Sequence, residues 1–142
     1  MKRSRPRLAM IGFRAGSGGV GRVMTTLMNA LVELGIEIDL LAERSPLTVN
    51  NFVFLARNQY FDDTICHRII PNFVVQCGDP TATGTGGPGY TIVDEPPAPG
   101  EYQIGSVAMA KTVEPDSAGS QFFIITGSDG AALPPEYALF GQ

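Results

Sequence analysis

The sequence predicts a mainly β fold with helices, in which a strand–helix unit precedes the β-rich part. The chain has 142 residues, a length that fits one domain. Its 17 glycines and 11 prolines favour a turn-rich, largely β architecture over a helical bundle. From Cys66 onward, short apolar runs are separated by turn signals, whereas helical spacing lies upstream of this point.

The first 41 residues predict a strand, a glycine-rich turn, a helix and a second strand. Leu8–Phe13 is a short apolar run, and the glycine-rich segment Arg14–Gly21 follows it. The helix is indicated by apolar residues spaced along one helical face: Val20, Val23, Met24, Leu27, Met28, Leu31 and Val32. Gly35 stands where a C-terminal cap belongs, and Ile36–Leu41 alternates in polarity like a half-buried strand.

A second helix is predicted to begin at Ser45 and Pro46. Serine is a favourable N-cap, and proline is tolerated at the first helical position, because its missing N–H would have no partner there. The apolar face of this helix consists of Val49, Phe52, Val53 and Ala56. This spacing predicts a helix packed with one side against the rest of the protein.

The β-rich part begins with a predicted hairpin. Cys66–Ile70 and Phe73–Cys77 are apolar runs on either side of a Pro-Asn turn signal. A loop rich in glycine and proline follows over residues 78–100. Further strands are predicted at Ser106–Lys111, Gln121–Thr126 and Tyr137–Phe140. The sequence contains no internal repeat.

Composition argues against several function classes. The net charge is −4, from 10 basic and 14 acidic residues, whereas a general nucleic-acid binder needs a basic face. The basic residues at the start precede only a short apolar run, so no signal peptide is predicted, and no stretch approaches the ~18 apolar residues of a membrane span. Two cysteines and one histidine argue against a metal site. Cysteines in a chain without a signal peptide favour a reduced, cytoplasmic setting.

Six separated segments share one further pattern. They are TVNNF (Thr48–Phe52), HRIIPNFVVQCGDP (His67–Pro80), GTGGPGY (Gly84–Tyr90), GSVAMAK (Gly105–Lys111), GSQFFI (Gly119–Ile124) and YALFGQ (Tyr137–Gln142). Their order and spacing resemble the cyclophilin-type peptidyl-prolyl isomerases. The resemblance covers residues 35–142 and implies an incomplete cyclophilin-like β-barrel, with helices at its ends and a peptide groove on its outer wall. It also implies an isomerase that acts on X-Pro bonds of proteins and peptides without a cofactor.

The chemistry of X-Pro isomerisation agrees with one residue of these segments. The amide has a barrier of ~18–20 kcal/mol, because resonance gives its C–N bond double-bond character. A catalyst needs no acid, nucleophile or metal. It has to hold the proline ring and donate a hydrogen bond to a nitrogen lone pair that exists only in the twisted state. Arg68 matches the family's catalytic arginine and is permanently charged, although an arginine in a strand is usually a solvated surface group.

The resemblance also implies the substrate-binding residues. Phe73, Val74, Phe123 and Leu133 match residues that line the proline pocket, while Gln76 and Gln121 match polar groups of the groove. The backbone around Ala110 and Lys111 matches the edge along which the substrate lies extended. Tyr137 stands where many relatives have a pocket histidine, and Ala132 where many have a tryptophan. Taken alone, the two phenylalanines would be interpreted as core aromatics.

The ends of the chain depart from the resemblance. We find neither a full cyclophilin's first strand nor the elements that follow its segment Tyr137–Gln142, so we expect open sheet edges and self-association through them. Residues 1–34 are predicted as a strand, glycine loop and helix of different origin, and residues 1–41 resemble the start of a GT-B glycosyltransferase. The expected partners are proline-containing peptides and unfolded proteins, not nucleic acids or membranes.

Two alternative functions stay open at this point. One is a module that binds proline peptides with little or no catalysis, because an incomplete barrel could still present the groove. The other is a glycosyltransferase remnant that binds a nucleotide sugar at the glycine-rich turn, where a helix N-terminus favours an anion. A proline-isomerisation assay separates the first alternative from an enzyme, and nucleotide-sugar binding identifies the second.

Cys66 and Cys77 stand where the family usually has phenylalanine and glycine. With a two-residue hairpin turn, the two cysteines would face each other, but Arg68 and Gln76 would lie on opposite faces of the sheet. The implied groove needs Arg68 and Gln76 on one face, so we expect either a register that differs by one residue or a bulge between the two strands. The cysteines then lie on opposite faces, and two free thiols are predicted.

Overall fold

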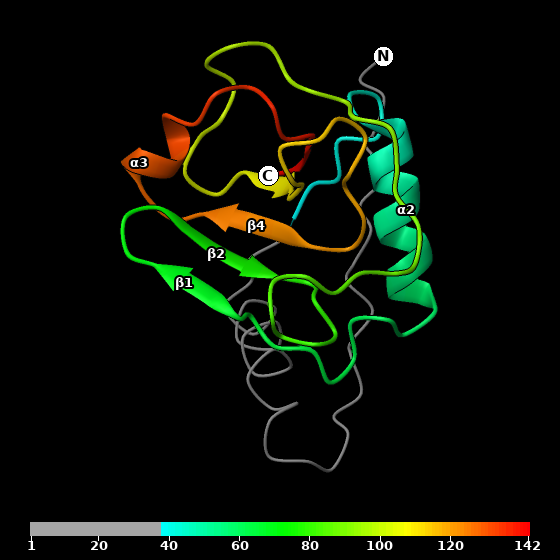
Figure 1. Cartoon of the computed structure of the whole chain (residues 1–142). Coiled ribbons are helices and arrows are strands. Elements are labelled where there is room, and N and C mark those ends of the chain that lie inside the picture. Colours follow the sequence, from blue (N-terminus) through cyan, green and yellow to red (C-terminus); the bar gives the residue numbers. More distant parts are fainter. Residues whose placement is uncertain (1–37) are drawn as a thin grey trace.

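The computed structural model describes residues 38–142 of the chain (Figure 1). The described elements are α2 (Pro46–Arg57), β1 (Arg68–Ile70), β2 (Val74–Cys77), β3 (Val107–Met109), β4 (Phe122–Ile125), α3 (Ser128–Ala131) and β5 (Leu139–Gly141). The strands form one five-stranded antiparallel sheet in the order β1-β2-β4-β3-β5. The prediction of a mainly β fold with helices is therefore confirmed.

The first predicted elements lie outside the described residues. These are the strand Leu8–Phe13, the glycine-rich turn Arg14–Gly21 and the helix that was expected to end before Gly35. The described end of the predicted strand Ile36–Leu41 runs beside β5, where Leu40 forms an antiparallel bridge with Gly141. The backbone hydrogen bonds on either side join residues 39 and 142 and residues 41 and 140. This segment contributes an isolated bridge instead of a full strand.

Helix α2 begins at the predicted residue, but its cap differs from the expectation. Pro46 is the first helical residue and Ser45 holds the N-cap position without a side-chain cap hydrogen bond. The Ser45 hydroxyl instead donates to the carbonyl of Leu139 at 2.9 Å, which ties the start of the helix to β5.

The cap of α2 comes from a carboxylate in the long loop. Glu95 accepts hydrogen bonds from the backbone N–H groups of Leu47 and Thr48, at 3.1 and 2.8 Å. Both N–H groups lie in the first turn, where no intrahelical acceptor is available. The negative charge also lies at the positive end of the helix dipole. Glu95 thus holds the loop against the start of α2, although the bonded residues lie more than 40 positions apart in the sequence.

Removal of this cap is expected to destabilise the fold modestly. Glu95→Ala should lower the free energy of unfolding by about 1 kcal/mol, the usual effect of losing a helix cap. Urea unfolding followed by circular dichroism measures the change. The exposed Glu114 supplies the control, because Glu114→Ala removes the same charge away from a helix. Equal unfolding curves for the two variants would contradict the capping role.

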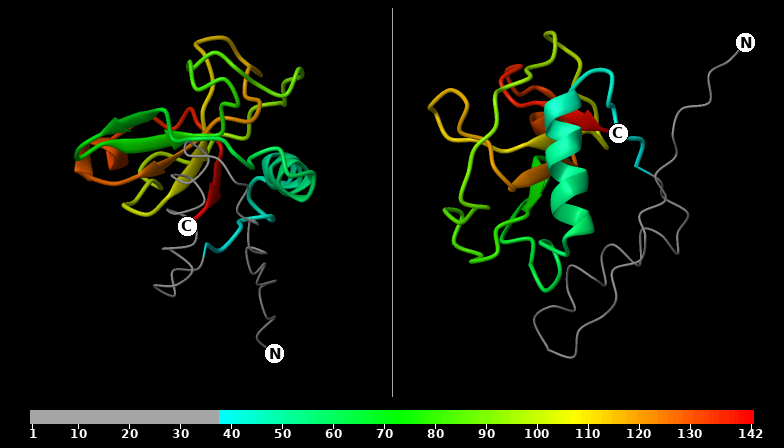
Figure 2. Two further views of the ribbon diagram at one scale, coloured as in Figure 1. Left: turned by 90° about the horizontal axis from the view of Figure 1, so that it is seen from below. Right: turned by 90° about the vertical axis from the view of Figure 1, so that its right-hand side faces the viewer.

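The core lies between α2 and one face of the sheet. Phe52 of α2 packs its ring against Phe122 and Phe140, with centroids 5.4 and 5.0 Å apart, and against Phe61 at 5.3 Å. In the right-hand view of Figure 2, α2 lies across the front of the sheet. Side chains alternate along a strand, so Phe123, the neighbour of Phe122, belongs to a second apolar cluster on the other face.

The hairpin of β1 and β2 has the shifted register, one of the two arrangements expected from the sequence. Arg68 pairs with Gln76 and Ile70 with Val74, so three residues form the turn instead of two. Asn72, in the middle of this turn, has a φ of 59°. Asparagine tolerates this left-handed conformation better than most residues. The prediction that Arg68 and Gln76 share one face of the sheet is confirmed.

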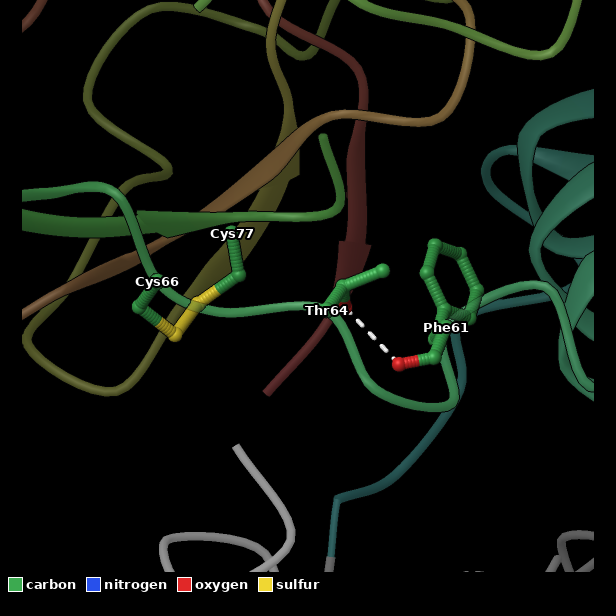
Figure 3. The surroundings of a disulfide bond; sticks show 4 residues. All are labelled: Phe61, Thr64, Cys66 and Cys77. Atoms are coloured by element: carbon green, nitrogen blue, oxygen red, sulfur yellow. Dashed lines mark hydrogen bonds between the residues drawn. A yellow bond between two sulfur atoms is a disulfide. The ribbon is translucent and has the colours of Figure 1, made fainter. Parts of the chain in front are cut away.

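The prediction of two free thiols is wrong, because Cys66 and Cys77 form a disulfide (Figure 3). The prediction assumed that strand alternation extends to both cysteines. However, β1 begins only at Arg68, so Cys66 precedes the strand and its side chain is free to turn toward β2. Cys77 is the last residue of β2, and Gly78 after it has a φ of 87°, which ends the extended backbone there.

Candidate functional site

A row of side chains crosses the sheet on the face opposite α2. Arg68 on β1 pairs with Gln76 on β2, which pairs with Phe123 on β4. Phe123 pairs in turn with Ala108 on β3. Directly paired residues of neighbouring strands point to the same face. The sheet register therefore brings the predicted catalytic arginine, one predicted polar residue and one predicted pocket residue into a single line.

Hydrogen bonds hold the polar part of this row. The Arg68 guanidinium donates from Nη1 to Oε1 of Gln76 at 3.2 Å, and Nε2 of Gln76 donates to Oε1 of Gln121 at 2.9 Å. The guanidinium carbon also lies 5.8 Å from the ring centroid of Phe73, within the range of a cation–π contact. Arg68 nevertheless remains exposed, so its guanidinium is accessible from the solvent.

An apolar cluster lies beside the arginine on the same face. Val74 and Phe123 are buried, and the partly buried residues that pack around the cluster include Phe73, Ala110, Leu133 and Tyr137. The rings of Tyr137 and Phe123 meet edge to face, with centroids 5.3 Å apart. The structure thus brings together all of the predicted site residues except the side chain of Lys111.

The Lys111 side chain belongs to a neighbouring cleft. Its Nζ donates to Oδ2 of Asp94 at 2.7 Å, and this hydrogen bond raises the pKa of Lys111. The cleft has a volume of about 590 Å³ and lies between residues 84–91 and residues 110–121. Gln76 and Gln121 line it as well, so the cleft adjoins the row that crosses the sheet. The predicted role of Lys111 rested on its backbone, and that role stays a prediction.

Two residues that support the site were missed at the sequence level. The buried Tyr102 donates its hydroxyl to the carbonyl of Tyr137 at 2.6 Å and accepts from the N–H of the same residue at 2.9 Å. Burial raises the pKa of Tyr102 to about 12, so the phenol stays protonated and can donate. Asp79, the second residue, binds the loop beside Gln121. Tyr102 stands in no sequence pattern that distinguishes it from an ordinary loop residue, and Asp79 lies in the segment His67–Pro80, within which no role was assigned to it.

Within residues 38–142, no group of three or more histidine, cysteine, aspartate or glutamate side chains could hold a metal ion. No helix in the same range is both long and apolar enough to cross a membrane. The polar groups of the site are the Arg68 guanidinium and the amides of Gln76 and Gln121, beside the apolar cluster. Together they place a hydrogen-bond donor, held by Gln76, beside an apolar cluster.

Comparison with known proteins identifies the class to which this site belongs. Residues 27–142 match the family model described as cyclophilin type peptidyl-prolyl cis-trans isomerase/CLD. The chain belongs to this family. The match begins before residue 35, and the separate origin predicted for residues 1–34 stays a prediction, as does their resemblance to glycosyltransferases.

Relatives in bacteria support the same assignment. The chain is 41% identical over 112 residues to a probable peptidyl-prolyl cis-trans isomerase B of Mycobacterium leprae. The match covers 68% of the chain and 37% of that protein. It is also 47% identical over 91 residues to peptidyl-prolyl cis-trans isomerase B of Bacillus subtilis. This match covers 63% of both proteins. The chain thus spans little more than a third of the length of the mycobacterial relative.

A solved cyclophilin shares the fold. The crystal structure of a Cryptosporidium parvum cyclophilin-type peptidyl-prolyl cis-trans isomerase in the presence of the dipeptide Ala-Pro matches with a TM-score of 0.68 at 37% identity. The match covers 75% of this chain and 70% of the other. The described residues therefore have the fold of a cyclophilin, as the sequence motifs implied.

Proposed function

We propose that the chain catalyses cis/trans isomerisation of X-Pro bonds in peptides and unfolded proteins. One observation supports this most directly: the guanidinium of Arg68 is fixed at the edge of the apolar cluster around Phe123. The cluster would hold the proline ring while the amide twists. The guanidinium would then donate a hydrogen bond to the prolyl nitrogen, whose lone pair becomes available only when amide resonance is lost.

Similarity to known proteins also supports the proposal. The relatives in Mycobacterium leprae and Bacillus subtilis are named as peptidyl-prolyl isomerases. The structural neighbour was crystallised in the presence of Ala-Pro, a dipeptide that contains one X-Pro bond. A dipeptide of this kind would fit the groove with its proline ring against Phe123 and its amide beside Arg68. Neither contact requires a cofactor.

A protease-coupled assay tests the proposed activity. The substrate is a short Ala-Pro peptide of which the protease cleaves only the trans form, so the slow phase reports isomerisation, which takes tens to hundreds of seconds without a catalyst. We expect the rate of this phase to rise in proportion to the concentration of the chain. Binding of Ala-Pro, detected by NMR, without any acceleration would support the binding module instead. A thermal shift with a nucleotide sugar alone would support the glycosyltransferase remnant.

We also propose a role in protein folding, because X-Pro isomerisation limits the folding of many chains. The cytoplasmic location expected from the sequence stays a proposal as well. It is tested by alkylation of the thiols in intact cells, since a reducing compartment would keep Cys66 and Cys77 as thiols. A fully disulfide-bonded pair in the cell would contradict a cytoplasmic location.

Self-association through a sheet edge is a further proposal. Among the described residues, β1 pairs only with β2, and the side chain of Ile69 on β1 is 65% exposed. Sedimentation should show association that increases with concentration, and Ile69→Lys should weaken it, because a charge on an edge strand opposes edge-to-edge pairing. Val113→Lys provides a control at another exposed apolar residue. A monomer at all concentrations would contradict the proposal.

A further inference from the structure

The carboxylate of Asp79 is fully buried and surrounded by hydrogen-bond donors. Its Oδ1 accepts from the N–H and the hydroxyl of Thr81, both at 2.7 Å. Its Oδ2 accepts from three backbone N–H groups, those of Thr83 at 3.1 Å, Gly84 at 2.6 Å and Gly86 at 3.1 Å. The segment that follows β2 is therefore wrapped around one side chain.

These donors keep Asp79 ionised. Burial alone would raise the pKa of Asp79, but the hydrogen bonds from Thr81, Gly86 and Gly84 outweigh it and hold the pKa below its usual range. The stabilisation that Asp79 provides is therefore present above about pH 4, the usual aspartate pKa, and is lost as the pH falls further. At neutral pH the carboxylate acts only as an acceptor, with both oxygens in use.

One of the donors connects Asp79 to the candidate site. Gly86 donates its N–H to Asp79, and its carbonyl accepts from Nε2 of Gln121 at 2.9 Å. Gln121 is the residue that holds Gln76, and Gln76 holds Arg68. A Cβ on residue 86 would collide with the Asp79 carboxylate, so the close approach of the loop to this group requires glycine.

The chemistry of the partners fixes the orientation of both glutamine amides. A carbonyl can only accept, so Gly86 requires the NH₂ group of Gln121 and turns its oxygen toward Gln76. A guanidinium can only donate, so Arg68 requires the oxygen of Gln76. The two requirements agree, and every link between Gly86 and Arg68 joins a donor to an acceptor. A displaced Gly86 carbonyl would leave both amides free to turn over.

We propose that Asp79 is a positioning residue for the isomerisation proposed above. Its carboxylate holds the Gly86 carbonyl in place, and the two glutamines pass this constraint on to the Arg68 guanidinium. An exposed arginine loses considerable rotamer entropy when it is held in one geometry. A hydrogen-bond chain that begins at a buried, saturated carboxylate fixes that geometry before the substrate arrives. The inference rests on the proposed function, because it assigns the consequence to catalysis by Arg68.

A double-mutant cycle with Arg68→Ala tests the proposal. Asp79→Asn keeps the size of the side chain but replaces one acceptor oxygen with a donor group. We expect it to lower kcat/KM by about tenfold to a hundredfold, the range expected when a catalytic group is misplaced. In the Arg68→Ala background, the same change should have less than about a twofold effect, because two residues that act through one group are not additive.

Thr81→Val supplies the matched control. This change removes the hydroxyl that donates to Oδ1 of Asp79. The hydrogen bond from the Gly86 N–H to Oδ2 stays intact. We expect its kcat/KM to stay within about threefold of the unmodified chain, even if its stability falls. All rates are measured below the onset of unfolding of each variant. Equal fold-losses from Asp79→Asn in the two backgrounds would overturn the proposal, because a purely structural effect does not depend on Arg68.

A second variant and a second measurement keep the test independent of folding and of the activity. Should Asp79→Asn not fold, Gly86→Ala displaces the same carbonyl and is expected to show the same dependence on Arg68. The Nε–H NMR signal of Arg68 in the free protein should broaden or shift in either variant and stay unchanged in Thr81→Val. An unmodified chain without isomerase activity would refute the proposed function. An unperturbed Arg68 signal in Asp79→Asn and Gly86→Ala would refute the positioning role.

Discussion

Replacement of Arg68 by alanine is expected to lower kcat/KM for X-Pro isomerisation about 100- to 1,000-fold, which corresponds to roughly 2.7–4 kcal/mol of lost transition-state stabilisation. The physical reason is that the guanidinium donates to a lone pair that the planar amide does not have. Arg68 is exposed and its described side-chain partners are Gln76 and Phe73. The free energy of unfolding should therefore change little.

Two further variants make this result specific. Arg68→Lys keeps the charge but loses the planar group that contacts Gln76 and the Phe73 ring together, so we expect it to recover only a small part of the rate. Arg57→Ala removes an arginine from the exposed last turn of α2 and should leave the rate unchanged. The protease-coupled assay measures all three. Equal rates for Arg68→Ala and the unmodified chain would exclude Arg68 as the catalytic group.

The elements of the fold with a clear periodic pattern could be predicted from the sequence. The apolar spacing placed α2, and the predicted strands Ser106–Lys111 and Gln121–Thr126 contain β3 and β4. The predicted strand at Tyr137–Phe140 begins two residues early, because Tyr137 is held by Tyr102 instead of a neighbouring strand. The one-turn helix α3 has no periodic pattern and was not predicted.

The site was predicted through motifs, and the structure shows how the fold assembles them. The row from Arg68 through Gln76 to Phe123 follows from strand register, which a single sequence specifies only through turn length and alternation. The support that Asp79 gives the loop could not be predicted, because it depends on backbone N–H groups that converge in space. Backbone donors are identical in every residue except proline and leave no signal in the sequence.

The cysteines show why alternation fails at the end of a strand. Side chains alternate wherever the ladder is continuous, so the directly paired Arg68 and Gln76 share one face, as predicted. Between that pair and the next bridge, Ile65 with Asp79, residues 66 and 67 lie outside any strand, whereas Cys77 is still the last residue of β2. Side chains there follow the local backbone and not a period of two, so Cys66 and Cys77 meet.

Reduction of the Cys66–Cys77 disulfide is expected to lower the free energy of unfolding by about 3 kcal/mol. The bond joins residues 11 positions apart, so it closes a short loop and restricts the unfolded chain. A dithiol reductant supplies the two electrons and two protons that convert the bond into two thiols, and is itself oxidised to a disulfide. Urea unfolding with and without this reductant measures the difference.

The double variant Cys66→Ala/Cys77→Ala separates the bond from other effects of the reductant. Alanine suits the fully buried position 77, where a serine hydroxyl would need a new partner. The variant should unfold at the urea concentration of the reduced chain and should not respond to the reductant. Activity should fall less than about tenfold, because the register that joins Arg68 to Gln76 does not depend on the bond. Titration of two free thiols in the folded, unreduced chain would contradict the disulfide and restore the prediction made from the sequence.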